Sequence, residues 1–228
     1  MPAAVIAIDG PSGSGKGTLA ESLARRLGWR LLDSGALYRI VALAAAQRDV
    51  DLDDGAALAD TARDLDIEFR PGDGGVVVQL DEQDVTLQIR AESVSATASR
   101  VAALPAVRKA LLERQQGLRR EPGLVADGRD MGTVVFPDAQ LKVFLEASAE
   151  ERAVRRHKQL IDKGLGGSLR ALLVAIRERD ARDQQRTESP LVAAQDAVII
   201  DSTALDIDAV EQRVWELIKA RGLLSEDG

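Results

Sequence analysis

The glycine-rich segment at residues 10–18 carries the residue types of a phosphate-binding loop. It reads Gly10-Pro11-Ser12-Gly13-Ser14-Gly15-Lys16-Gly17-Thr18, follows a short apolar run at 3–8, and leads into a helical pattern at 16–27. Glycines let backbone N–H groups turn toward an anion, and the helix that follows adds the positive end of its dipole. Lys16 adds a full charge that can reach the β- and γ-phosphates of a nucleotide. The segment therefore predicts a nucleotide-phosphate site.

One position departs from the general pattern of such loops. The residue after the lysine is usually Ser or Thr, whose hydroxyl binds Mg²⁺, but here it is Gly17, with Thr18 next. Lys16-Gly17-Thr18 resembles the nucleoside monophosphate kinases, in which nucleotide oxygens and water hold most of the metal. We therefore predict no protein side chain as a direct metal ligand.

Two further segments place charged residues where predicted strands end. Asp33-Ser34 stands before a helical pattern at 35–48, and Arg39, one turn into it, can direct its guanidinium at a second phosphate. Asp127-Gly128-Arg129-Asp130-Met131-Gly132-Thr133 follows an apolar run at 123–127. Ligands of parallel sheets bind at the carboxyl ends of the strands, and packing alone does not explain charges between glycines there. These segments predict a second anionic substrate.

The region 149–186 has a basic character that the whole chain lacks. Residues 150–190 hold 10 Lys and Arg against 7 Asp and Glu, in a chain whose net charge is −7. On the predicted helix at 168–186, Arg179, Arg182 and Arg186 share a face with Asp183. Two interpretations stand open: a solvated face with ion pairs, or a site for one strongly anionic ligand. Two helices around the glycines at 164–167 also suit a lid that closes over phosphates.

The elements that must position these residues follow an alternating pattern. Strands are predicted at 3–8, 31–32, 123–127, 141–145 and 197–201, and helices at 16–27, 35–48, 149–162, 168–186 and 207–220. This order predicts an α/β fold with a mainly parallel sheet covered by helices on both faces. Three short alternating runs within 64–90, with a helix before them at 55–64, predict a small antiparallel sheet. We expect one domain over 1–228, with an insert at about 50–98 and a lid at about 149–186.

Composition excludes several classes of protein. The 228 residues are 45% hydrophobic, enough for a buried core, and contain no cysteine for disulfides, thiolate zinc sites or nucleophiles. The negative net charge and 3% aromatic content argue against binding of nucleic acid. No signal segment and no apolar run of about 18 residues is present. We therefore expect a cytoplasmic protein without membrane or nucleic-acid partners.

A phosphate loop does not by itself name an activity. A GTP-driven switch would need an aspartate two residues after a guanine-reading lysine, and no lysine of the chain has one. Two interpretations remain: a kinase for a nucleoside monophosphate or another small metabolite, and a regulator that binds ATP without a second substrate. The charges at 129–130 and 179–186 favour the kinase, because a regulator has no need of a second anion site.

Four motifs in order carry a resemblance to the bacterial cytidylate kinases, over essentially the whole chain and including the insert. They are the loop at 10–18 and the segments 33–39, 127–139 and 177–186. The resemblance implies a P-loop kinase fold with an antiparallel nucleotide-binding insert and a helical lid. It implies a monomer that transfers the γ-phosphoryl group of ATP, with Mg²⁺, to CMP or dCMP in pyrimidine nucleotide metabolism.

The same resemblance implies roles for individual residues. Residues 10–18 would hold ATP, and the CMP phosphate would contact Arg39 and Arg129. The cytosine ring would face Ser34, Arg108, Asp130 and Arg186, and the sugar hydroxyls would contact Ser99, Arg179 and Asp183. Asp127 ends an apolar strand near the loop, and we expect it to order water around Mg²⁺. The predicted catalytic residues are thus Lys16, Arg39, Asp127 and Arg129.

Overall fold

The computed structural model describes residues 2–72, 75–162, 164 and 166–224, which form two compact units. Unit 1 comprises Met1–Asp33 with Gln116–Gly228, and unit 2 comprises Ser34–Gln115. Each unit has its own sheet. The predicted insert at 50–98 falls within unit 2, which is wider on both sides; its role as a nucleotide-binding insert stays a prediction.

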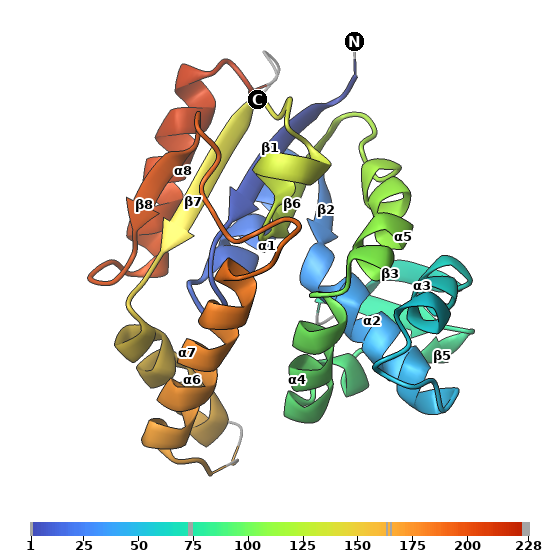
Figure 1. Ribbon diagram of the computed structural model, residues 1–228. Helices are drawn as coiled ribbons and strands as arrows, with labels where there is room; N and C mark the ends of the chain where they lie inside the picture. Colours follow the sequence, from blue (N-terminus) through green and yellow to red (C-terminus); the bar gives the residue numbers. More distant parts are fainter. Residues whose placement is uncertain (1, 73–74, 163, 165, 225–228) are drawn as a thin grey trace. The chain divides into compact units, whose positions relative to one another are not determined.

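Unit 1 is built on a five-stranded sheet in the order β2-β6-β1-β7-β8, seen in Figure 1. Every strand pair in it is parallel, which confirms the predicted sheet. The strands are β1 (Ala4–Asp9), β2 (Arg30–Asp33), β6 (Gly123–Gly128), β7 (Leu141–Glu146) and β8 (Val198–Asp201). In this register Asp127 pairs with Asp33 on β2, and Asp9 of β1 pairs with Gly128. Asp33 and Asp127, two of the predicted charged residues, therefore lie side by side at the carboxyl edge of the sheet.

Two helices of unit 1 pack against each other and against the sheet. They are α1 (Lys16–Leu27) and α8 (Ile207–Ala220), and both match their predicted bounds. Leu19 and Leu23 of α1 form one core cluster with Val214 and Ile218 of α8 and the buried residues of the strands. Each such side chain stabilises the fold by about 1.5–3 kcal/mol through burial. Among the described residues, no helix is long and apolar enough to cross a membrane.

The predicted lid region forms two helices that pack together, α6 (Ala149–Asp162) and α7 (Leu169–Gln184). Ser148 caps α6, since its hydroxyl accepts a hydrogen bond from Glu151 N at 3.2 Å. The reciprocal bond of a capping box is missing, because Ser148 N donates to Thr203 and the Glu151 carboxylate accepts from Arg155 instead. Closure of these helices as a lid stays a prediction.

A short helical turn over Met131–Val135 follows β6 and contacts β1, on the near side of the sheet in Figure 1. It has π-helical hydrogen bonding, as in the bond from Phe136 N to Met131 O at 2.7 Å. This turn could not be predicted from the sequence, because five residues are too few for a helical period to appear.

Unit 2 combines four helices with a three-stranded antiparallel sheet, β3-β4-β5. Helix α2 packs against both α3 and α4, and Pro105 begins α5. The elements of this unit are α2 (Ser34–Gln47), α3 (Gly55–Arg63), β3 (Ile67–Gly72), β4 (Gly75–Leu80), β5 (Gln83–Asp84), α4 (Glu92–Val101) and α5 (Pro105–Gln116).

The third alternating run, Val85/Leu87/Ile89, is not a strand, and that part of the prediction is wrong. Strand β5 is already over at Asp84, whose carboxylate accepts a hydrogen bond from Thr86 N and turns the chain. A 3₁₀ turn (η1, Gln88–Arg90) follows, with Ile89 buried and Leu87 83% exposed. Apolar residues at every second position over five residues are expected both for a strand and for a turn whose first and last residues are buried, so this pattern does not distinguish the two.

Candidate active site

The predicted phosphate loop connects β1 to α1 in a conformation that only glycine allows at its first position. Gly10 has φ +151°, and a Cβ there would lie 2.2 Å from the carbonyl oxygen of Leu145. Ser14 is buried, and its hydroxyl has no hydrogen-bond partner among the described residues. A buried hydroxyl without a partner is costly in an unliganded fold. The loop thus fits a ligand that accepts hydrogen bonds, as phosphate oxygens do.

Lys16 is buried at the start of α1, close to both the loop and the end of β6. Its Nζ donates a hydrogen bond to the carbonyl of Pro11 at 3.0 Å and lies 4.0 Å from Asp127 Oδ1. The pKa of Lys16 is lowered to about 7: burial is the largest cause, the nearby charge of Arg129 acts in the same direction, and the Asp127 carboxylate offsets only part of the effect. A bound anion would stabilise the charged form of Lys16 and so raise its pKa again.

The structure gives a reason for glycine at position 17. A Cβ on Gly17 would lie 3.2 Å from Asp127 Oδ2, so a larger side chain would crowd this carboxylate. Asp127 thus stands beside the position where the general pattern has a hydroxyl. No group of three acidic or histidine side chains in the described chain could hold a metal ion.

Three predicted substrate residues meet around one buried carboxylate in unit 1. Asp183, with a side chain 1% exposed, accepts a hydrogen bond from Arg129 Nε at 3.0 Å and another from Arg186. Burial opposes its ionisation, but the charges of Arg129, Arg186 and Arg179 outweigh burial and hold the pKa of Asp183 below its usual range. Three guanidinium groups thus gather at Asp183, and such a group of cations suits an anion as ligand.

Asp9, the last residue of β1, was missed by sequence reasoning. Its two carboxylate oxygens accept hydrogen bonds from Met131 N and Gly132 N, both at 2.8 Å, at the start of the helical turn. The pKa of Asp9 is raised to about 7: burial is the largest cause, the two backbone hydrogen bonds act against it, and the charges of Asp130 and Asp127 add to the rise. Asp9 therefore holds the loop that carries Arg129 and the buried Asp130. The signal that could have found it is a carboxylate closing an apolar strand.

The remaining predicted residues belong to unit 2. Ser34 and Arg39 lie on α2. Ser99 is buried on α4, with a hydroxyl that has no hydrogen-bond partner among the described residues. Arg108 of α5 donates to the carbonyl of Ala102 at 3.0 Å and lies 5.5 Å from the ring centroid of Tyr38. That these residues contact the same substrate as the Asp183 cluster stays a prediction.

Comparisons with known proteins agree with this arrangement. A family model described as cytidylate kinase matches residues 6–220. A cytidylate kinase from Aeromonas salmonicida is 58% identical over 208 residues, covering 91% of this chain and 90% of its own length. Another from Pseudomonas aeruginosa is 59% identical over 220 residues, covering 96% of each chain. The chain belongs to the cytidylate kinase family.

One solved structure is similar to this chain in fold alone. The crystal structure of an uncharacterised protein from Eubacterium ventriosum has a TM-score of 0.50 at 12% sequence identity, and the match covers 95% of this chain and 98% of that one. The kinase assignment therefore comes from the sequence relatives, and the parallel sheet from the structure itself.

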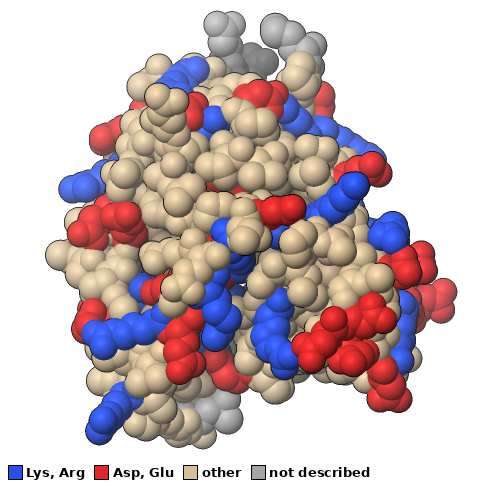
Figure 2. Space-filling view, in the orientation of Figure 1, with Lys and Arg blue, Asp and Glu red and all other residues tan. Residues whose placement is uncertain are grey.

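The exposed residues of the basic region match the interpretation as a solvated face, and a site for an anionic ligand stays a prediction. Figure 2 shows Lys and Arg side chains mixed with acidic ones over the surface that α6 and α7 form. Exposed ion pairs account for part of this face, such as Arg177 with Glu150. The cluster at Asp183 is buried and is the part that suits a ligand.

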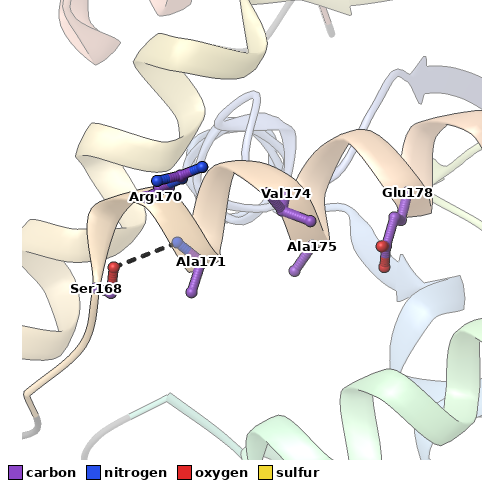
Figure 3. Close-up of a pocket in the computed structure, with 6 residues that line it drawn as sticks. All are labelled: Ser168, Arg170, Ala171, Val174, Ala175 and Glu178. Atoms are coloured by element: carbon purple, nitrogen blue, oxygen red, sulfur yellow. Dashed lines mark hydrogen bonds between the residues drawn. The ribbon is translucent and has the colours of Figure 1, made fainter.

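A surface pocket along α7 is separate from the predicted site residues. Figure 3 shows its lining on one side of the helix, where the Ser168 hydroxyl accepts from Ala171 N. The lining residues are Ser168, Arg170, Ala171, Val174, Ala175 and Glu178. With one arginine and one glutamate among small side chains, it has no excess of positive charge for a phosphate.

Proposed function

We propose that this member of the cytidylate kinase family transfers the γ-phosphoryl group of ATP to CMP or dCMP, giving ADP and CDP or dCDP. The observation that carries the proposal is the guanidinium cluster at Asp183, which lies in the same unit as the phosphate loop. One anion site would suffice for a regulator, whereas a phosphotransferase must hold two anionic substrates. The identity to cytidylate kinases supports cytidine nucleotides as the acceptors.

We assign ATP to the loop at Gly10–Thr18. The inward-turned backbone, the Ser14 hydroxyl and the Lys16 ammonium suit the β- and γ-phosphates. Mg²⁺ bound to the nucleotide would neutralise charge that builds up on the transferred group. Carboxylates and water are the ligands that Mg²⁺ prefers, so we assign to Asp127 the ordering of water around the ion.

The acceptor assignments follow the family resemblance residue by residue. Arg39 and Arg129 would hold the CMP phosphate. Ser34, Arg108, Asp130 and Arg186 would face the cytosine ring, and Ser99, Arg179 and Asp183 would bind the sugar hydroxyls. The orphaned hydroxyl of Ser99 and the ionised carboxylate of Asp183 support the sugar contacts, since hydroxyl groups can satisfy both.

The chemistry needs no general base. The second pKa of a phosphate monoester is about 6, so the attacking oxygen of CMP is already ionised at pH 7. Catalysis then rests on holding the two phosphates in line and on neutralising charge, the role of Lys16 and the arginines. Closure of α6 and α7 as a lid would exclude water, which could otherwise accept the phosphoryl group.

A substrate panel tests the proposal directly. With MgATP, the purified protein should phosphorylate CMP and dCMP, with little turnover of AMP or GMP. The measurement is a coupled assay of ADP release across CMP, dCMP, UMP, AMP and GMP. AMP as the best acceptor would overturn the assignment of the base, and tight ATP binding with no acceptor turned over would favour the regulator.

Asp130 is the residue that we expect to read the base. Its carboxylate can accept from the amino group of cytosine, whereas uracil would present a carbonyl oxygen and leave two acceptors opposed. Asp130→Ala should therefore lower kcat/KM for CMP at least about tenfold more than for UMP. If both constants fall equally, Asp130 only supports its neighbours and does not select cytosine.

We place the protein in the cytoplasm as a monomer that acts on free nucleotides, without nucleic-acid or membrane partners. The net charge of −7 and the 3% aromatic content support the lack of a polyanion partner. Sedimentation at micromolar concentration would expose a stable dimer.

A further inference from the structure

Arg152 of α6 joins three segments that are far apart in the sequence. Its side chain is 4% exposed, and Nε donates to the carbonyl of Ala147 at 2.9 Å. One terminal nitrogen donates both to the carbonyl of Ser12 and to Asp180 Oδ1, each at 3.0 Å, and the other donates to Asp180 Oδ2 at 2.5 Å. A buried guanidinium with this many fixed partners is a rigid connection rather than a solvated charge.

On one side, this connection fixes the phosphate loop. The peptide between Ser12 and Gly13 is planar, so holding the Ser12 carbonyl toward Arg152 points the N–H of Gly13 the opposite way. A Cβ on Gly13 would lie 3.4 Å from Arg152 Cβ and 3.7 Å from Cγ, so the stem of Arg152 packs along the loop. Arg152 thus sets the orientation of one loop N–H without being part of the loop.

On the other side, the connection reaches the helix that carries the guanidinium cluster. Asp180 follows Arg179 directly and stands one turn before Asp183 on α7. Its carboxylate takes both terminal nitrogens of Arg152, the bidentate geometry that restricts rotation of both side chains. A shift of the Ser12 peptide is therefore transmitted to α7 through two side chains.

We propose that Arg152 and Asp180 are positioning residues that couple occupancy of the phosphate loop to the placement of Arg179 and Asp183. The inference rests on the proposed function, which assigns ATP to the loop and CMP to α7. Phosphates bound at the loop restrain the Ser12–Gly13 peptide, and the bidentate pair passes this restraint to α7. Because coupling free energy is reciprocal, each nucleotide then binds more tightly when the other is present.

The experiment measures this coupling as a ratio of dissociation constants. Kd for CMP is determined by calorimetry without and with a saturating, non-hydrolysable MgATP analogue. Typical coupling is 5- to 150-fold, so we expect CMP to bind at least about fivefold more tightly with the analogue present. In Asp180→Asn, one of the two bonds to Arg152 is lost while the shape is kept, and the ratio should fall toward one. Affinity for the analogue alone should change less than about twofold.

A matched control is available on the same two helices. Arg177 of α7 pairs with Glu150 of α6, but the two side chains are 61% and 59% exposed and neither bonds to the loop. Arg177→Gln should leave the ratio unchanged, because this pair joins the helices without reaching the phosphate loop. An equal fall of the ratio in Arg177→Gln and Asp180→Asn would overturn the proposal, since any contact between α6 and α7 would then couple the two sites.

Two further results keep the test decisive. If Asp180→Asn does not fold, as judged by circular dichroism, Asp180→Glu is measured instead; it keeps the charge but displaces the carboxylate, and the ratio should still fall. A wild-type ratio of one, or an unchanged ratio in the variants, overturns the coupling while CMP binding stands. Failure of CMP to bind at all overturns the proposed function, and the coupling with it.

Discussion

Lys16 combines a position at the phosphate loop with a pKa lowered to about 7 by burial. At pH 8 the free protein therefore holds this amine mostly neutral, while ATP is fully ionised. Bound phosphates favour the charged form, so we expect ATP binding at pH 8 to take up close to one proton. The measurement is calorimetry in buffers of different ionisation enthalpy, where the slope of binding enthalpy gives the protons exchanged.

Lys16→Arg provides the control for this proton uptake. A guanidinium stays charged at pH 8 in either state, so the slope should fall to near zero even where binding weakens. An equal slope in this variant would locate the proton on another group, and no slope in the parent would mean that Lys16 is already charged before ATP arrives.

Lys16 and its loop could be predicted from the sequence, but the contact of Arg129 with Asp183 and the role of Arg152 could not. The loop residues follow one another in the chain, and a motif of contiguous residues fixes their geometry locally. The partners of Arg152 are 140 and 28 residues away, so only the fold brings them together. As one of several arginines on a polar helix, Arg152 carried no signal of its own.

The helical turn at 131–135 is capped by Asp9, a residue of β1, and not by a residue of its own segment. The first N–H groups of a helical turn lack partners within it, and the Asp9 carboxylate accepts two of them. The end of β1 thus fixes both the phosphate loop that follows it and the loop carrying Arg129 and Asp130. The two hydrogen bonds connect the ends of the neighbouring strands β1 and β6 and give a reason for an acidic residue at this buried position.

Asp9 should give the stability of the protein a distinct pH dependence. Its folded-state pKa of about 7 lies above the ordinary aspartate value of 3.8, so between pH 4 and 7 the folded state binds more protons than the unfolded state. This group's contribution to the free energy of unfolding is present below pH 4 and is lost as the pH rises through 7. Asp9→Asn cannot titrate, so its stability relative to the parent should rise across that window.

Urea unfolding of both proteins at intervals from pH 4.5 to 8 measures this difference. Asn leaves one backbone N–H poorly paired, which should make the variant less stable by about 1–3 kcal/mol at the acidic end. The difference should shrink as the pH rises and then level off above 7. A constant difference would mean that Asp9 is ionised throughout, and that its two backbone hydrogen bonds outweigh its burial.

Elements whose hydrophobic pattern continues over many residues could be predicted from the sequence, whereas short elements could not. The bounds of α1 and α8 follow from apolar spacing over three turns or more, because one buried face fixes the period. The run Val85–Ile89 is too short for its apolar spacing to distinguish a strand from a turn. Thr86 accepts a hydrogen bond from Val78 N and donates one to Asp84, and these bonds favour the turn. At α6, Ser148 caps the helix, but the distant Thr203 replaces half of the capping box, which local patterning does not reveal.

At the scale of the whole molecule, the predicted substrate residues divide between two compact units. Unit 1 holds the phosphate loop and the Asp183 cluster, and unit 2 holds Ser34, Arg39, Ser99 and Arg108. The predicted insert at about 50–98 lies within unit 2, which also contains α2 and nearly all of α5. Which helix joins which unit depends on contacts between distant residues, such as those of α2 with α4.

This division predicts different footprints for the two nucleotides in hydrogen exchange. A non-hydrolysable ATP analogue alone should slow exchange in the loop at Gly10–Thr18, whose N–H groups we assign to phosphates. CMP alone should slow exchange in both units: in Ser99–Arg108 of unit 2 and in Arg179–Arg186 of unit 1. At a hundredfold excess over Kd, amides that exchange only from the free protein should slow by up to about a hundredfold.

The variant Lys16→Ala separates the two footprints. Lys16 is a buried polar residue at the start of α1 and is not part of the apolar core, so the variant should fold and keep the CMP footprint while losing that of the analogue. Peptide-level mass spectrometry resolves the segments, since they are far apart in the chain. Protection by CMP in one unit only would contradict the assignment of residues from both units to a single acceptor. Protection in both would in turn explain why Ser99 keeps a buried hydroxyl for which the described protein residues offer no partner.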